Sequence, residues 1–175
     1  MRHFRNPPII IDIEASGFGP ESYPIEIGVV LSDGLRQAKL IHPHDSWTFW
    51  SFEAEKIHGI KREQLLNRGL PVREAALALN HLLRNERTFS DCWVVDKPWL
   101  DKLFLFAKVK QSFSLSPIEA ILPDEQIHYW DKAKEMVQKK LNVKRHRAST
   151  DAMVIQQTYL KSKELARING ANSVA

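Results

Sequence analysis

The chain has 175 residues, 43% of them hydrophobic and 26% charged, which is the balance of a soluble globular domain large enough to bury a core. Its formal net charge of +4 allows a polyanionic partner without requiring one, and its single cysteine excludes a disulfide framework. No stretch approaches the roughly 18 apolar residues of a membrane span, and no signal-peptide core follows the basic start. We expect one cytoplasmic domain over residues 1–163 without membrane contact, and a polar tail over 164–175.

The first third of the chain predicts three strands. Residues 9–13 are a continuous apolar run rich in isoleucine, typical of a strand buried on both faces. Residues 25–31 and 35–41 predict two further strands, and an Asp-Gly pair between them is a strong hairpin signal. Residues 42–54 are expected to form an aromatic-rich connection.

Helical patterns dominate the rest. Apolar residues recur at helical spacing over residues 72–83, directly after a proline. Short strands are expected at residues 88–90 and 93–95. Further helices are expected over residues 96–107, 124–141 and 149–161. Together these elements predict one α/β domain with a mixed central β-sheet flanked by helices.

Two acids end the first strand. Asp12 and Glu14 alternate with Ile13, so their side chains point to the same face of the sheet. The end of a core strand is also where sheet-based folds commonly place ligand sites. Grouped carboxylates repel one another unless a cation binds them, and oxygen ligands favour a hard ion. The alternative is a strand that runs into solvent and carries two surface acids.

A histidine and an acid near the other end form a second group. His146 and Asp151 are five residues apart, so they would not share a helix face. Ser149 is a suitable N-cap, which places Asp151 in the first turn of the last helix and His146 in the loop before it. The histidine could then fold back over a site to which the acid contributes. The alternative is an acid that only favours the helix dipole.

The middle of the chain offers one more candidate acid. Asp96 precedes Pro98 and therefore belongs at the start of a helix, where it could also be a simple cap. Asp101 falls on the solvent side of the same helix. Asp91 is harder to exclude and could add a further charge near the site.

Taken together, these residues resemble the histidine branch (DEDDh) of the DEDD superfamily of 3′–5′ exonucleases, which includes proofreading exonucleases, ribonuclease T and oligoribonuclease. The family's first motif, Asp-x-Glu, is matched at residues 12–17, and its last, His-x-Ala-x-x-Asp-Ala, at residues 146–152. Residues 25–28 are similar to the family's second strand, and residues 57–60 to an Ile-His-Gly-Ile segment of proofreading-type members.

The family's middle motif is matched only in part. Many relatives have His-Asn-x-x-Phe-Asp, whereas residues 91–96 read Asp-Cys-Trp-Val-Val-Asp. The acid at position 96 keeps its spacing, but the polar pair that precedes it in relatives is replaced. This departure leaves the substrate contacts around that position open.

The resemblance implies a ribonuclease H-like fold and hydrolysis of phosphodiester bonds at the 3′ end of single-stranded DNA or RNA, with release of nucleoside 5′-monophosphates. Two Mg²⁺ or Mn²⁺ ions would stabilise the attacking and leaving oxygens. The implied metal ligands are Asp12, Glu14, Asp96 and Asp151, and His146 would accept the proton of the attacking water. Several members of the family form homodimers, which this sequence neither requires nor excludes.

The residues expected to bind the substrate are Ser16, Gly17, Phe18, Ile57, His58, Arg145 and Arg147. Phe18 could wedge against the terminal base, with a core position as the alternative. The Ile-His pair could line the same pocket, or it could simply precede a tight turn. The two arginines could contact phosphates, although basic runs are more often solvated surface. Trp47 and Trp50 could stack bases, but we expect them to pack in the core.

Two other functions stay open. A non-catalytic nucleic-acid-binding module of the same fold is disfavoured because every catalytic-type residue is present. A Mg²⁺-dependent phosphoesterase for small molecules would be indifferent to polymer length or to a blocked 3′ end. No residue identifies a contact to the 2′-hydroxyl, so DNA and RNA are both candidate substrates.

Overall fold

The computed structural model describes residues 6–143 and 146–172, with side chains up to residue 169. A five-stranded sheet lies at its centre, in the order β3-β2-β1-β4-β5. The strands are β1 (Ile9–Ala15), β2 (Pro24–Val30), β3 (Arg36–Leu40), β4 (Arg87–Ser90) and β5 (Ser114–Pro117). β1, β2 and β3 pair antiparallel, whereas β4 pairs parallel with β1 and β5. The sheet is therefore mixed, as predicted.

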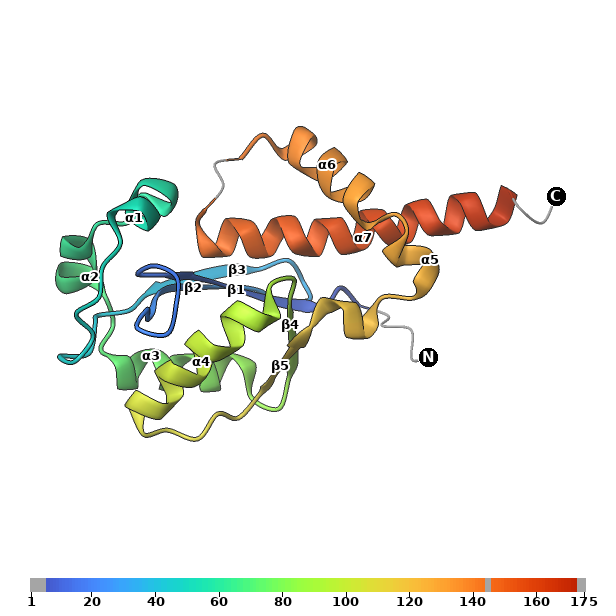
Figure 1. Ribbon diagram of the computed structural model, residues 1–175. Coiled ribbons are helices and arrows are strands. Elements are labelled where there is room, and N and C mark those ends of the chain that lie inside the picture. The colour runs from blue at the N-terminus through green and yellow to red at the C-terminus, as the bar shows by residue number, and fades with distance from the viewer. Residues whose placement is uncertain (1–5, 144–145, 173–175) are drawn as a thin grey trace.

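Helices cover both faces of this sheet (Figure 1). They are α1 (Phe52–His58), α2 (Arg62–Arg68), α3 (Val72–Leu83), α4 (Trp93–Ala107), α5 (Asp124–Ile127), α6 (Trp130–Leu141) and α7 (Ala148–Asn172), with a 3₁₀ turn at Ile118–Ile121. On one face α7 packs against β1, β2 and β3, and α5 and α6 pack on α7. On the other face α4 packs against the sheet and against α3.

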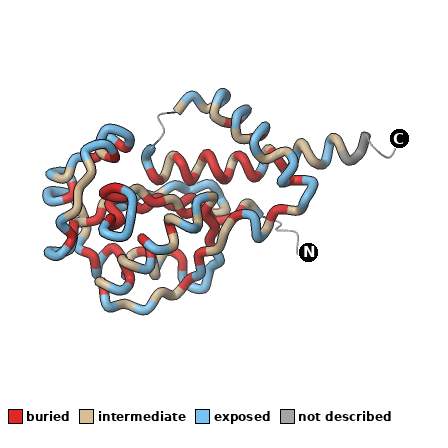
Figure 2. Tube along the Cα trace, in the orientation of Figure 1, coloured by how far each residue is buried: buried red, intermediate tan, exposed pale blue. Residues whose placement is uncertain are grey.

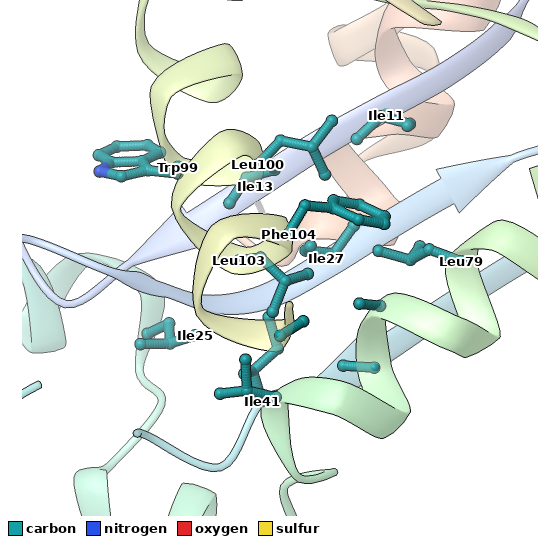
Figure 3. Close-up of a cluster of buried hydrophobic side chains, with 14 of the residues drawn as sticks. Ile11, Ile13, Ile25, Ile27, Ile41, Leu79, Trp99, Leu100, Leu103 and Phe104 are labelled. Atoms are coloured by element: carbon teal, nitrogen blue, oxygen red, sulfur yellow. The ribbon is translucent and has the colours of Figure 1, made fainter. Parts of the chain in front are cut away.

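The alternation of side chains along β1 decides where the acids lie. Ile11 and Ile13 belong to the larger hydrophobic cluster, which includes Leu100 of α4 (Figure 3). Ile10 belongs to a second cluster that includes residues of α7. Because successive side chains point to opposite faces, Asp12 and Glu14 share the face of Ile10. Both acids are therefore on the side of the sheet that α7 covers.

The register of β1 and β2 shapes this face further. Asp12 lies opposite Gly28, and Glu14 lies opposite Glu26. Residues that face each other on antiparallel strands have their side chains on the same side. A Cβ on Gly28 would lie 2.1 Å from backbone atoms of Ala148 and of the next residue. The glycine therefore lets the start of α7 approach the sheet beside Asp12.

Most predicted elements are confirmed, including the hairpin between β2 and β3, but two segments differ. Residues 93–95 are not a strand. They form the first turn of α4, in which the Asp96 amide donates to the Cys92 carbonyl at 3.0 Å. Residues 52–54 are helical and belong to α1, because the Ser51 hydroxyl caps this helix by accepting a hydrogen bond from the Ala54 amide.

The C-terminal helices differ from expectation in their bounds. Helix α7 begins at Ala148, so Ser149 is not its N-cap, and the Asp151 amide donates to the Arg147 carbonyl. It continues to Asn172, past residue 161, where we expected the last helix to end. Figure 2 shows that its buried positions lie in the half that crosses the sheet. The predicted helix over residues 124–141 is divided into α5 and α6. In the described part of the chain, no helix has the length and hydrophobicity to cross a bilayer.

Candidate active site

Four acids from three parts of the chain converge at the end of β1. Asp12 and Glu14 come from this strand, Asp96 from the first turn of α4, and Asp151 from the first turn of α7. Asp96 and Asp151 are 3% and 5% exposed. The charges of the other three acids all raise the pKa of Asp12, which reflects how closely they gather. The structure therefore brings together all four predicted metal ligands.

Burial and repulsion raise the pKa values of Asp12, Glu14 and Asp96 when no cation is bound. The pKa of Glu14 rises to about 7, mainly through burial and then through the charge of Asp151. Burial also raises the pKa of Asp96 to about 7, although a hydrogen bond from the Ser90 hydroxyl favours its charged form. The pKa of Asp12 lies well above its usual range. A divalent cation would relieve this repulsion, so this set of oxygen donors fits a metal site.

His146 completes the group. One ligand atom from each of Glu14, His146 and Asp151 lies within 4.8 Å of the other two. The backbone of His146 is left-handed, with φ at 64°, and its amide donates a hydrogen bond of 2.7 Å to Asp151 Oδ2. The loop before α7 thus turns the exposed histidine back toward the carboxylates.

A hollow of about 190 Å³ opens beside the acids. Its lining includes Asp12, Glu14 and Asp96, together with four predicted substrate contacts, Gly17, Phe18, Ile57 and His58. Phe18 is 74% exposed, which excludes a core position for it. The hollow therefore combines acidic groups with an apolar, solvent-accessible rim.

His58 lines this hollow and has one ring nitrogen without a hydrogen-bond partner. The residue is 3% exposed, and burial lowers the pKa of its ring. Its Nδ1 accepts a hydrogen bond of 3.0 Å from the Ile60 amide, whereas its Nε2 is buried without a partner. In a neutral ring whose Nδ1 is an acceptor, Nε2 carries the proton. The buried Nε2–H group of His58 therefore has no hydrogen-bond acceptor among the described residues.

Other predicted contacts lie elsewhere. Ser16 is buried, and its hydroxyl accepts from the Tyr23 amide at 3.2 Å, so it closes the loop rather than lining the hollow. Trp47 is buried and stacks on Tyr23, and the indole of Trp50 donates to a glutamate of α1 at 2.7 Å, which agrees with structural roles. Arg147 is ion-paired with Glu26. Arg145 falls outside the described residues.

Sequence reasoning missed Glu26 as a neighbour of the site. It is 1% exposed, the lowest value among the described acids. Its Oε1 accepts from Arg147 Nη2 at 2.5 Å, and its Oε2 accepts from Arg147 Nε at 3.1 Å and from the Ala148 amide at 2.9 Å. The signal in the sequence is an acid between two isoleucines in an apolar strand, because such an acid needs a partner when buried.

Asp91, which the sequence leaves open, lies near the site but is paired. Its Oδ2 receives a salt bridge of 2.8 Å from Lys134 of α6. Its charge nevertheless contributes to the raised pKa values of Asp12 and Asp96. The hydrophobic periodicity that predicts α6 gives no indication of this contact between distant segments.

The fold of this chain is similar to that of several solved structures. A complex of E. coli exonuclease I with a dA16 oligonucleotide is 14% identical over 91% of this chain, with a TM-score of 0.67. The zinc-bound form of the E. coli exonuclease I complex with single-stranded DNA is 13% identical over 90%, with a TM-score of 0.67. A further structure of exonuclease I is 15% identical over 91%, with a TM-score of 0.69.

The present chain spans 40–42% of the length of these chains. No family model matches the sequence, and no curated protein matches it. At this level of identity the likeness concerns the fold, and it confirms the predicted one. The chain has a ribonuclease H-like α/β fold, with a mixed five-stranded sheet between helices, as exonuclease I does.

Proposed function

We propose that this chain is a metal-dependent 3′–5′ exonuclease that shortens single-stranded DNA or RNA and releases nucleoside 5′-monophosphates. The observation that carries the proposal is the convergence of four acids from β1, α4 and α7 beside His146. Structures of exonuclease I with this fold include complexes with DNA oligonucleotides, which supports a nucleic-acid substrate.

The residues divide the chemistry between them. Asp12, Glu14, Asp96 and Asp151 would hold two Mg²⁺ or Mn²⁺ ions, which supply charge stabilisation at the attacking and leaving oxygens when bound. His146 lies close to Glu14 and Asp151, where it would take the proton of the attacking water. Because His146 is exposed, it can pass this proton to solvent.

The hollow suits the terminal nucleotide. The exposed ring of Phe18 offers a surface on which a base can stack, and base–aromatic stacking tolerates every base. The Nε2–H group of His58 would donate to an acceptor of the same nucleotide. A base must be unpaired to enter, so we expect single strands to be hydrolysed faster than duplexes.

The test uses 5′-labelled DNA and RNA oligonucleotides of one sequence, each with a free or a phosphorothioate-blocked 3′ end. We expect a ladder that shortens from the free 3′ end in Mg²⁺ or Mn²⁺, and no product in EDTA. If the blocked strand and a small phosphodiester are hydrolysed as fast as the strand with a free 3′ end, the result favours the small-molecule phosphoesterase. Strand binding without hydrolysis by the folded, metal-bound protein would favour the binding module.

A further inference from the structure

We propose that Glu26 is a positioning residue, which fixes His146 over the carboxylates by anchoring the two residues that follow it. The inference rests on the proposed function, because it concerns the base of that reaction. Glu26 does not line the hollow, and it is not among the three residues whose ligand atoms lie within 4.8 Å of one another, Glu14, His146 and Asp151. Its carboxylate instead binds the side chain of Arg147 and the backbone of Ala148.

The contacts of Glu26 depend on a carboxylate. Both of its oxygens accept hydrogen bonds, and all three donors belong to Arg147 or Ala148. A glutamine of the same shape would replace one of the two oxygens with an NH₂ group, which is a donor and cannot accept the hydrogen bonds made to that oxygen. Charge-assisted, bidentate contacts also fix orientation as well as distance. Glu26→Gln should therefore weaken the attachment of Arg147 and Ala148 without leaving a cavity at position 26.

Glu26 lies on β2, directly beside the part of β1 that bears two of the proposed metal ligands. Glu26 is opposite Glu14 in the register of the two strands, and Gly28 is opposite Asp12. Because Gly28 has no Cβ, the first turn of α7 can lie directly on β2. Strand β2, which lies beside the proposed metal ligands of β1, thus also holds the residues that follow His146.

His146 is held from two sides by this arrangement. On the helix side, Asp151 Oδ2 accepts its backbone amide at 2.7 Å. On the sheet side, Glu26 holds residues 147 and 148. A base must lie within hydrogen-bonding reach of the proton that it abstracts. Loss of the Glu26 anchor should therefore lower the rate of the chemical step more than it weakens substrate binding.

A second tether of the same helix provides a matched control. Arg36 of β3 donates to the Ser149 carbonyl at 3.2 Å and to the Thr150 hydroxyl at 2.9 Å. These contacts hold the first turn of α7 but not the loop before it. Arg36→Gln tests whether any loss of attachment at this turn affects the reaction.

The experiment is a double-mutant cycle with a single-stranded oligonucleotide. Glu26→Gln, His146→Ala and the double variant are compared in kcat, KM and Mg²⁺ affinity, with single-turnover measurements at high enzyme concentration for the slow variants. We expect Glu26→Gln to lower kcat about tenfold or more with KM changed less than about threefold. In the His146→Ala background the same change should cost less than about twofold. The Mg²⁺ affinity of Glu26→Gln should stay within about twofold of the wild-type value. The kcat of Arg36→Gln should also stay within about twofold of wild type.

Two results would overturn the inference: an unchanged kcat in Glu26→Gln, or the same loss with and without His146. If Glu26→Gln does not fold, Arg147→Lys replaces it in the cycle with the same expectations, because lysine keeps the charge but not the forked contact. An inactive wild-type protein would reject the proposed function. An active wild type with additive losses would reject this inference alone.

Discussion

Glu14 and Glu26 lie directly opposite each other on adjacent antiparallel strands, but they have different partners. Glu26 is neutralised by Arg147, whereas the carboxylate of Glu14 lies within 4.8 Å of His146 and Asp151. The charge of Glu26 is itself one reason for the raised pKa of Glu14. This difference agrees with the roles that we propose, an anchor for Glu26 and a metal ligand for Glu14.

Asp12→Asn should abolish hydrolysis and stabilise the metal-free protein. Asp12 has a strongly raised pKa because it is buried among other acids, so removing its charge relieves repulsion. We expect a gain in the free energy of unfolding on the order of 1–2 kcal/mol in EDTA at pH 8. Urea denaturation measures it, and Asp45→Asn, in an exposed loop, is the control that should change neither property. Substantial hydrolysis by Asp12→Asn would remove Asp12 from the site.

The stability of the metal-free protein should fall as the pH rises. The folded-state pKa of Glu14 is raised from 4.5 to about 7, and that of Asp96 from 3.8 to about 7. Between these limits the folded state binds more protons than the unfolded state. The stability that these two acids contribute to the folded protein is therefore complete at low pH, and it is lost as the pH approaches and passes 7.

Mg²⁺ should counter this loss if, as we propose, the charged carboxylates are its ligands. We expect Mg²⁺ to increase the free energy of unfolding much more at pH 8 than at pH 5, as measured by urea denaturation with and without the ion. An equal effect of Mg²⁺ at both pH values would contradict the assignment of these acids as its ligands.

His58→Asn should weaken substrate binding and leave the fold intact. Asparagine can keep the acceptor that receives the Ile60 amide, but it removes the unpartnered Nε2–H group that we propose as a donor to the nucleotide. We expect KM to increase about tenfold with a smaller change in kcat. His128→Asn is the control, because this exposed histidine lies outside the hollow. A KM equal to that of the wild type would exclude the proposed contact of His58.

Gly28→Ala should reduce both stability and hydrolysis, because the new Cβ would collide with the backbone at the start of α7. We expect a loss of about 2 kcal/mol or more in the free energy of unfolding. Gly34→Ala is the matched control, since Gly34 has φ at 87° but open space around it. Its strain should cost stability without moving α7. If both variants hydrolyse the oligonucleotide at the wild-type rate, the close approach at Gly28 does not matter for the site.

The sequence predicted those parts of the molecule in which local pattern and tertiary environment agree. The isoleucine run of β1 is buried on both faces, and the alternation of Asp12 with Ile13 correctly predicts that both acids share a face. The prediction failed at Val94 and Val95, whose β-branched side chains suggested a strand. There the chain instead begins α4, whose later residues Leu100 and Leu103 pack into the core.

The remaining features depend on contacts between distant residues. The pairing of Glu26 with Arg147 joins residues 121 positions apart, and that of Asp91 with Lys134 joins residues 43 apart. The periodicity of a single segment contains no information on such pairs. The end of α7 shows a different limit: Ser162 is its last buried residue among those described, yet the helix continues to Asn172.

The proposed metal site is tested by hydrolysis of a 5′-labelled single-stranded oligonucleotide by wild-type protein and Asp12→Asn, side by side, in Mg²⁺ and in EDTA. We expect the wild type to shorten the strand stepwise from the 3′ end in Mg²⁺ but not in EDTA, and the variant to shorten it in neither. Equal shortening by both proteins, or shortening that persists in EDTA, would contradict a metal site built on Asp12.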